Sequence, residues 1–242
     1  MIKLPGSPSR KRLVMVVLGG GVTLIVVVFL LVYFVIFPTS SPKPFKLATS
    51  TATTSPASTS TAGATGRWSV TTGSEAGYRV REKLAFLPAQ SDAVGRTSSI
   101  TGAAMLSESK GEITIAAASF DVAVNTLKSD RSMRDEKIHE IGLESSRYPT
   151  ATFVMSAPVS FTTSAVAGHV TRASVTGVFT IHGTSRSRTL PVEFTLSGST
   201  LEAAGSITFP WSEFGMSAPS IGGFVNVTEH ATMEFDLRLQ RA

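Results

Sequence analysis

Four histidines are the side chains of this sequence best suited to acid–base or metal chemistry. They are His139, His169, His182 and His230, and no two of them have the short spacing of a metal-binding pair. The chain has no cysteine, which excludes a thiolate nucleophile, a disulfide and a Cys-ligated metal. Phosphate-binding loops, dinucleotide-binding glycine patterns and the G-x-S-x-G elbow are also absent. The sequence therefore predicts no catalytic residue, metal site or cofactor. A hydrolase or redox enzyme would need His182 or a carboxylate to line an open cleft.

The densest group of charged side chains lies in residues 129–153, SDRSMRDEKIHEIGLESSRYPTATF. Its many helix formers predict a helical crossing that interrupts a β domain, and Pro149 ends it because proline has no backbone donor. A strand should resume at Thr150. At helical spacing, four apolar residues would form a narrow buried stripe: Met133, Ile138, Ile141 and Leu143.

From Arg67 onward, the sequence on both sides of this crossing alternates apolar and polar residues in short runs. In the last run, 231–240, the alternation gives one apolar and one solvated face. About eight such strands in residues 67–242 fit either an antiparallel sandwich or a closed barrel. A barrel of about eight strands holds either packed side chains or one elongated ligand. Four glycines are predicted to mark turns: Gly111, Gly183, Gly198 and Gly205.

The first 66 residues differ in composition from the rest of the chain. Residues 1–12 are basic, and residues 13–37 are 25 residues without a charge, long enough at ~1.5 Å per residue to span a membrane as a helix. This run is too long for a signal peptide, whose apolar region is about 7–15 residues. The four Lys or Arg before it predict a cytoplasmic amino terminus and an extracytoplasmic remainder in a cell membrane. Residues 38–66 are rich in Ser, Thr, Ala and Pro, which predicts a disordered linker.

The positive charge of the chain is concentrated in this amino-terminal part. Six basic and no acidic residues precede residue 67, which leaves 16 of the 22 basic residues against all 17 acidic ones in the β domain. A nucleic-acid surface would need clustered Lys and Arg on that domain. The distribution therefore favours a protein that does not bind nucleic acid.

Four segments of the β domain together resemble the YceI-like family. They are FDVAVNTLKSDRSMRDEKI, SSRYPTATFVM, VTGVFTIHGTSRSRTLPVEF and GSITFPWSEFGM. Arg134 and Asp135 match the family's Arg–Asp pair in the crossing. The sequence departs from the family where Glu82 stands near the place of a frequent His, and where Pro210 and Trp211 stand in place of an Arg.

The resemblance implies a mainly β fold, an eight-stranded antiparallel lipocalin-like barrel at 67–242. The transmembrane helix and linker predicted from composition precede it. Family members hold a polyisoprenoid in an apolar tunnel, so the implied ligand is an isoprenoid or other long apolar lipid. The helical crossing would then be a solvated lid over one mouth of the barrel, in which Arg134 and Asp135 form a salt-bridged turn or anchor the lid. A structural or protein-interaction module without a small ligand is the alternative, and a packed interior would distinguish it.

Alternation directs twelve large apolar side chains into the barrel, where they either line a ligand tunnel or fill a core. The predicted ligand-binding residues are Tyr78, Val80, Phe153, Met155, Phe179, Ile181, Phe194, Ile207, Phe209, Phe214, Phe235 and Leu237.

Overall fold

The computed structural model describes residues 23–24, 27–28, 41–47, 63–84, 90–162, 170–221 and 225–242. It consists of two compact units, Met1–Ser41 and Pro42–Ala242. In the first unit, residues 23, 24, 27 and 28 are α-helical, and the rest of the predicted transmembrane segment 13–37 and the tail 1–12 lie outside the described residues. Among the described residues, no helix is both long and apolar enough to cross a membrane.

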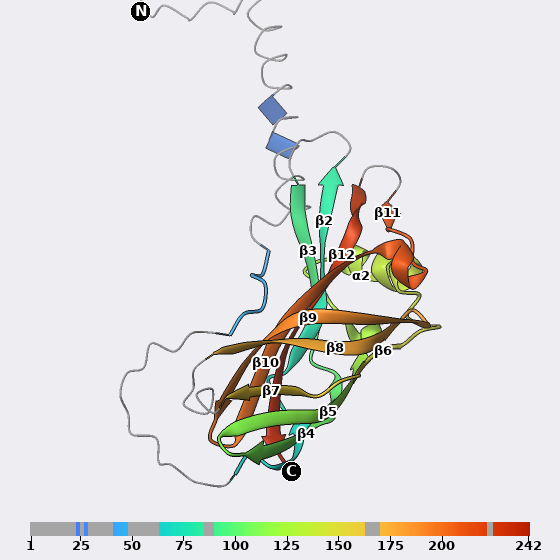
Figure 1. Ribbon diagram of the computed structural model, residues 1–242. Helices are drawn as coiled ribbons and strands as arrows, with labels where there is room; N and C mark the ends of the chain where they lie inside the picture. Colours follow the sequence, from blue (N-terminus) through green and yellow to red (C-terminus); the bar gives the residue numbers. More distant parts are fainter. Residues whose placement is uncertain are drawn as a thin grey trace, which may run out of the picture. The chain divides into compact units, whose positions relative to one another are not determined.

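The second unit is built almost entirely from β-strands, joined mostly by short turns (Figure 1). The strands are β1 (Gly66–Val70), β2 (Glu75–Leu84), β3 (Gln90–Thr97), β4 (Ile100–Ser109), β5 (Glu112–Ala123), β6 (Thr150–Met155), β7 (Val159–Thr162), β8 (Thr171–Ile181), β9 (Thr184–Ser197), β10 (Thr200–Pro210), β11 (Ser220–Ile221) and β12 (Val225–Arg241). The helical elements are η1 (Val124–Thr126), α2 (Ser132–Lys137), the π-helical turn η2 (Ile138–Gly142) and η4 (Trp211–Phe214).

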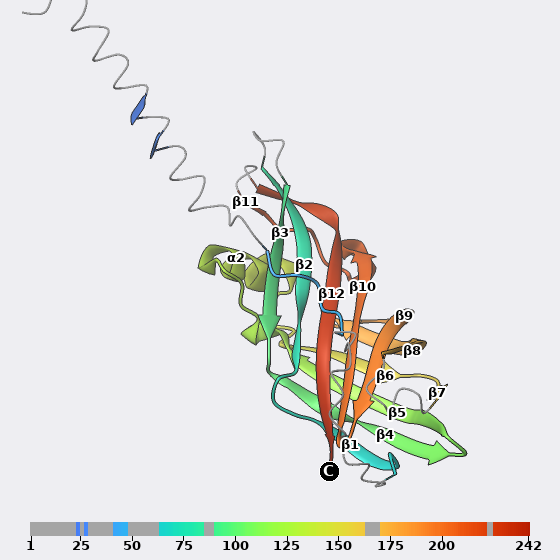
Figure 2. The ribbon, with the colours of Figure 1, turned by 90° about the vertical axis from the view of Figure 1, so that its left-hand side faces the viewer.

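The sheet closes on itself as an antiparallel barrel. Its neighbours follow the order β1-β4-β5-β6-β8-β9-β10-β12, and β1 pairs with β12 to complete the ring of eight strands. This closure confirms the predicted eight-stranded barrel and excludes the sandwich. The long strand β12 also pairs with β2, which pairs with β3, so these strands continue beyond the ring (Figure 2).

Alternation along β12 separates the interior from the outer wall as predicted, except that Glu234, expected on the solvated face, is buried. Leu237 and Leu239 are buried in the core, and Met233 and Phe235 pack against it. Trp68 of β1 closes the core near the carboxyl end of β12, where its indole Nε1 donates a 2.8 Å hydrogen bond to the Ala64 carbonyl oxygen. The barrel interior is therefore built from the apolar faces that the sequence pattern indicates.

Three of the four glycines predicted to mark turns do so. Gly111, Gly183 and Gly198 have φ values of 80°, 70° and 57°, the left-handed region that favours glycine. The prediction for Gly205 is wrong, because this residue lies inside β10, opposite Phe235 of β12. Because Gly205 has no side chain, the Phe235 ring can pack directly against the β10 backbone at this position.

The crossing between β5 and β6 is shorter than the predicted helical stretch. It contains α2 and η2, and β6 begins at Thr150 as predicted. The predicted apolar stripe is only partly correct: Ile138 is buried and Leu143 half-buried, but Met133 and Ile141 are exposed. The cause is the π turn, in which the Leu143 amide donates to the Ile138 carbonyl at 2.7 Å, so helical spacing ends after six residues.

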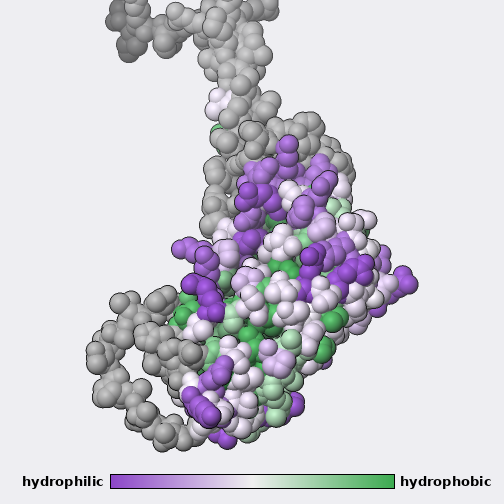
Figure 3. All heavy atoms as spheres, in the orientation of Figure 1, coloured by the Kyte–Doolittle hydropathy of each residue, from purple (hydrophilic) through white to green (hydrophobic). Residues whose placement is uncertain are grey.

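The surface of the barrel unit is mixed in character (Figure 3). Hydrophilic side chains gather over the upper part of the face shown, where β2, β3 and β12 extend beyond the ring, and hydrophobic ones form patches over the strands below. Charges on the outside of the extended strands suit a sheet region with an open edge, because they discourage pairing with other strands.

Candidate functional site

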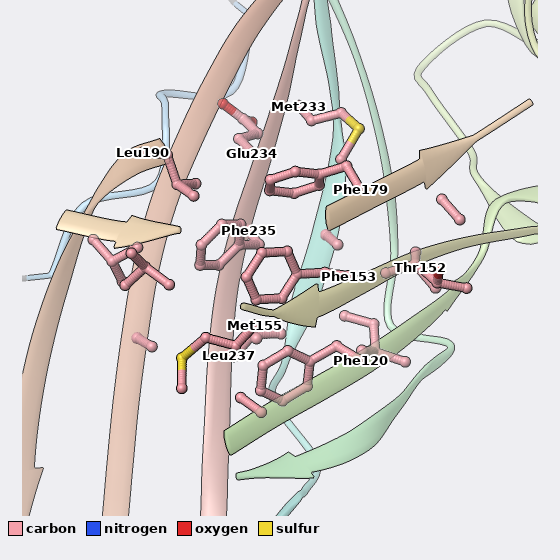
Figure 4. A pocket seen from close by; sticks show the side chains of 18 of the residues that line it. Phe120, Thr152, Phe153, Met155, Phe179, Leu190, Met233, Glu234, Phe235 and Leu237 are labelled. Carbon is pink, nitrogen blue, oxygen red and sulfur yellow. The ribbon is translucent and has the colours of Figure 1, made fainter. Parts of the chain in front are cut away.

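An apolar cavity occupies the interior of the barrel. The space open to the centres of water molecules is about 150 Å³, and every ring strand except β1 contributes to its lining. Thr152 and Glu234 are the only lining residues with strongly polar side chains. Figure 4 shows the aromatic and thioether side chains that face one another across it. Such a space suits an apolar ligand, because burial of apolar surface is its main source of affinity.

Eight of the twelve predicted ligand-binding residues line this cavity. They are Tyr78, Phe153, Met155, Phe179, Ile181, Phe194, Phe235 and Leu237. The other four are outside its lining: Val80 borders a smaller cavity, Phe209 and Phe214 pack edge-to-face with centroids 4.8 Å apart, and Ile207 packs against the core half-buried. Val80, Phe209 and Phe214 are buried, but Phe214 lies on η4 and not on a strand, and alternation does not distinguish the middle of the barrel from its end.

Part of the lining was missed by the sequence reasoning. Phe120 and Val122 of β5 line the cavity, and so do Leu127 and Leu143 of the crossing. The alternation in EITIAAASFDVAVNTL was a signal for the first two, because it places them on one face of a strand. No comparable pattern marks Leu127 and Leu143, which lie outside the strands.

Three phenylalanines on neighbouring strands form an aromatic row along the cavity wall. Phe120 of β5 is the direct cross-strand partner of Phe153 of β6, which is the partner of Phe179 of β8. The ring centroids are 6.5 Å apart in the first pair and 4.8 Å apart in the second. Direct cross-strand aromatic pairs stabilise a sheet. The row therefore strengthens the wall while it presents flat apolar surface to the interior.

Glycines explain why these rings leave space instead of filling the barrel. A Cβ atom added at any of four strand glycines would overlap an aromatic ring of the lining, so each ring packs directly against a glycine. Cross-strand packing of an aromatic ring over a glycine is a known way to stabilise glycine within a sheet. The four pairs are Gly95 with Tyr78, Gly102 with Phe120, Gly177 with Phe153 and Gly205 with Phe235.

One end of the barrel is closed by the crossing between β5 and β6. Leu127 and Leu143 line the main cavity from this segment, and Ile138 borders a second cavity of about 20 Å³. The same segment contacts the β8–β9 turn, where Tyr148 and His182 have ring centroids 4.3 Å apart. The crossing therefore lies at a barrel end, which is the position that the lid prediction requires.

A buried ion pair ties this lid to strand β2. Arg134 of α2 donates from Nε and Nη2 to the two carboxylate oxygens of Glu82 at 2.9 and 3.0 Å, and it also contacts Asp130. The Arg134 and Glu82 side chains are only 10% and 9% exposed, so the prediction of a fully solvated lid surface is wrong for Arg134. Burial lowers the pKa of Arg134, but the hydrogen bonds that Arg134 donates to Glu82 and the negative charges of Glu82 and Asp130 leave the pKa above its ordinary value. Arg134 is thus a permanent cation in the lid-anchoring arrangement.

Tyr78 separates the two cavities, because its side chain borders both. Burial raises the pKa of its hydroxyl above the ordinary range. The hydroxyl has no hydrogen-bond partner among the described residues. The nearby Ser129 hydroxyl is engaged with Arg131 and Arg134 instead.

Two of the three described histidines, His139 and His182, have structural partners. His139 contacts the Leu127 carbonyl at 3.0 Å and the Ser145 hydroxyl at 2.8 Å, and His182 contacts Glu144 at 3.2 Å. His169 lies outside the described residues, and His230 is exposed on β12. Within the part of the chain that the structure describes, no three His, Asp or Glu residues are grouped as metal ligands.

Comparison with known proteins agrees with this architecture. The sequence model of the YceI-like domain family matches residues 68–239 of this chain. A polyisoprenoid binding domain from Saccharophagus degradans, implicated in plant cell wall breakdown, has a TM-score of 0.54 and 12% identity over 74% of this chain and 99% of that chain. The Campylobacter jejuni YCEI protein has a TM-score of 0.51 and 14% identity over 66% and 91%. These structural similarities show the fold alone. Curated proteins gave no significant match.

Proposed function

Because the chain belongs to the YceI-like family, we propose that it is a membrane-anchored binding protein that holds an isoprenoid or similar long apolar lipid inside its barrel. The single observation that carries this proposal is the apolar cavity in the barrel interior. The alternative, a structural or protein-interaction module without a small ligand, requires a packed interior, and the cavity argues against it.

The lining favours a hydrocarbon chain over a polar ligand. Glu234 is engaged by Arg79 and Arg96, and its carboxylate points away from the rings (Figure 4), so the cavity offers almost no directional polar contact. Met155 and Met233 add flexible thioether side chains, which adapt to irregular apolar shapes such as a methyl-branched chain. The isoprenoid class is proposed because one similar structure is a polyisoprenoid binding domain.

The proposed location rests on the amino-terminal sequence. The uncharged run 13–37 would anchor the protein, and the four basic residues before it would stay in the cytoplasm. The barrel would then stand outside the cytoplasmic membrane, close to a reservoir of apolar lipid. Fractionation of cells, with protease added to intact spheroplasts, tests this: a barrel that is soluble or protected from protease would refute it.

Native mass spectrometry of the full-length protein, followed by solvent extraction, tests the ligand. We expect one long-chain apolar lipid per barrel. The Phe side chain of Ala203→Phe, on the inner face of β10, should occupy the space of roughly four methylene groups of the ligand. The binding free energy should then weaken by about 3 kcal/mol, which is a ~100-fold loss of affinity. The matched control is Ser206→Phe, the same change on the exposed face of the same strand. A barrel that is purified without any lipid and binds no added isoprenoid alcohol would refute the proposal.

A further inference from the structure

Two arginines on the outer wall of the barrel hold a segment that precedes the barrel in the sequence. Arg79 of β2 donates from Nη2 to the Pro42 carbonyl oxygen at 2.7 Å, and Arg96 of β3 donates from Nη2 to the Lys43 carbonyl oxygen at 2.7 Å. We name residues 42–47 the docked segment. It falls within the stretch whose composition predicts a disordered linker, yet it is bonded to two adjacent strands.

The rest of the docked segment adds side-chain and backbone contacts. The Phe45 ring lies 3.8 Å from Cζ of Arg96, a cation–π arrangement. The Leu47 amide donates to a Glu193 carboxylate oxygen of β9 at 3.1 Å. Phe45 and Leu47 are half-buried. The other four residues of the segment are exposed: Pro42, Lys43, Pro44 and Lys46. The segment thus uses alternate side chains against the wall, as an extended peptide bound to a surface does.

The wall beneath the docked segment is organised by strand residues alone. Glu234 of β12 is 2% exposed and accepts from Arg79 Nε at 3.2 Å and from Arg96 Nη2 at 3.1 Å. Asp92 holds Arg79 at 3.3 Å, and Glu75 lies 3.9 Å from Arg96. Both guanidinium groups are therefore fixed by carboxylates on the strands, with donors left over for the two carbonyl groups. A preorganised site loses less entropy on binding than a mobile one.

The position of the docked segment in the sequence gives it a consequence. Phe37 ends the uncharged run, and Pro42 follows five residues later, which an extended chain covers in at most ~18 Å. A linker free from residue 38 to Gly66 would instead reach ~100 Å. We propose that docking of residues 42–47 on Arg79 and Arg96 acts as a short tether that keeps the barrel wall near the membrane surface. This inference rests on the proposed membrane anchor.

Spin labelling of the full-length chain tests the docking, and the absence of native cysteine makes single-site labels straightforward. A label at Lys46→Cys, whose side chain is exposed, should be restrained. A label at Thr54→Cys, in the stretch whose composition predicts disorder, serves as the reference. Arg96→Ala should raise the ratio of mobile to restrained label at position 46 about tenfold, because a hydrogen bond and a cation–π contact are lost. Arg188→Ala, which removes an arginine paired with Glu213 elsewhere on the wall, should leave the ratio unchanged.

Phe45→Ala is the second variant, because Phe45 lies outside every strand and its loss leaves the barrel intact even if Arg96→Ala does not fold. In liposomes, energy transfer from a fluorophore at Ser187→Cys to labelled lipid should fall when Phe45→Ala frees the segment. A label at position 46 as mobile as that at position 54 overturns the inference. So does unchanged energy transfer with a freed segment. The mobility measurement is made in detergent as well, so it stands even if the chain fails to enter liposomes or to bind lipid, which would refute the proposed function instead.

Discussion

Removal of one partner of the Glu82–Arg134 pair should destabilise the protein strongly, whereas removal of both should not. The two side chains are about 90% buried and joined by two hydrogen bonds of 2.9 and 3.0 Å. Loss of one partner leaves the other as an uncompensated buried charge, which costs about 3–5 kcal/mol. Replacement of both by apolar side chains of similar size removes the desolvation penalty together with the attraction, and is neutral or stabilising by up to ~4 kcal/mol.

The assay is urea unfolding of the variants Arg134→Met, Glu82→Leu and the double variant. Trp68 and Trp211 are buried, so their fluorescence reports loss of the barrel. If the unfolding free energy falls by about 2–3 kcal/mol per M urea, each single change should lower the urea concentration at the unfolding midpoint by roughly 1–2 M. The double variant should have a midpoint near that of the wild type. The coupling free energy from this double-mutant cycle isolates the pair.

The control for this cycle is Arg81→Met, which breaks an ion pair with Asp92 on the barrel surface, where Arg81 is 58% exposed and Asp92 keeps its ion pair with Arg79. Its midpoint should stay near that of the wild type, because exposed ion pairs contribute little. Additive losses in the double variant, or a single Arg134→Met change without a measurable effect, would refute the assignment of Arg134 and Glu82 as a buried pair that holds the lid to β2.

Three further changes test the interior and the wall. Gly177→Ala would place a methyl group against the Phe153 ring and 2.7 Å from a strand carbonyl oxygen, so thermal melting should show a loss of about 1–3 kcal/mol; an unchanged melting temperature would contradict the packing of ring on glycine. Tyr78→Phe removes a buried hydroxyl without a partner among the described residues, so chemical denaturation should show equal or higher stability, and a clear loss would reveal a bond at that oxygen. Burial raises the pKa of Asp236 in the folded protein. The ionised carboxylate therefore destabilises the folded state at pH values above this pKa, and the effect disappears at low pH, where Asp236 is protonated in both the folded and the unfolded state. Asp236→Asn should therefore stabilise at neutral pH by an amount that shrinks as pH falls, and a gain that grows in acid would contradict this sign.

Residue alternation predicted the faces of the strands well because burial on one face of a sheet has a period of two. Met233 and Phe235 of β12 face the interior as the pattern indicates. Closure of the ring could not be derived in this way, because it depends on the pairing of β1 with β12 at opposite ends of the domain. Periodicity is local, whereas this register joins Trp68 to Arg241. Only the family resemblance favoured the barrel over the sandwich.

The cavity was harder to predict than the fold. A large apolar side chain at an inward position can fill a core or line a space, and the choice depends on what lies beside it across the strands. Phe153 leaves space because Gly177 is beside it, and Phe235 because of Gly205. Gly205 was expected in a turn because glycine commonly marks turns, so its role within the sheet went unnoticed.

The docked segment carried a weak sequence signal. Phe45 and Leu47 are the only large apolar residues between positions 38 and 62, and both are half-buried against the wall. Two apolar residues do not change the average composition of a stretch rich in Ser, Thr, Ala and Pro, so composition alone predicts a disordered linker here. The carbonyl groups that the arginines hold have no sequence signature at all, because every residue has one.

The glycines that contact the aromatic rings also help to determine the width of the barrel interior, because they determine how far each ring extends into it. A single methyl group at Gly177 or Gly205 would meet the Phe153 or Phe235 ring first and push it inward, which would narrow the interior with no change to any side chain of the lining. These two glycines lie on different strands, β8 and β10, so substitutions there would constrict the space in separate steps. The width of the interior is thus set in part by residues that lie behind its lining.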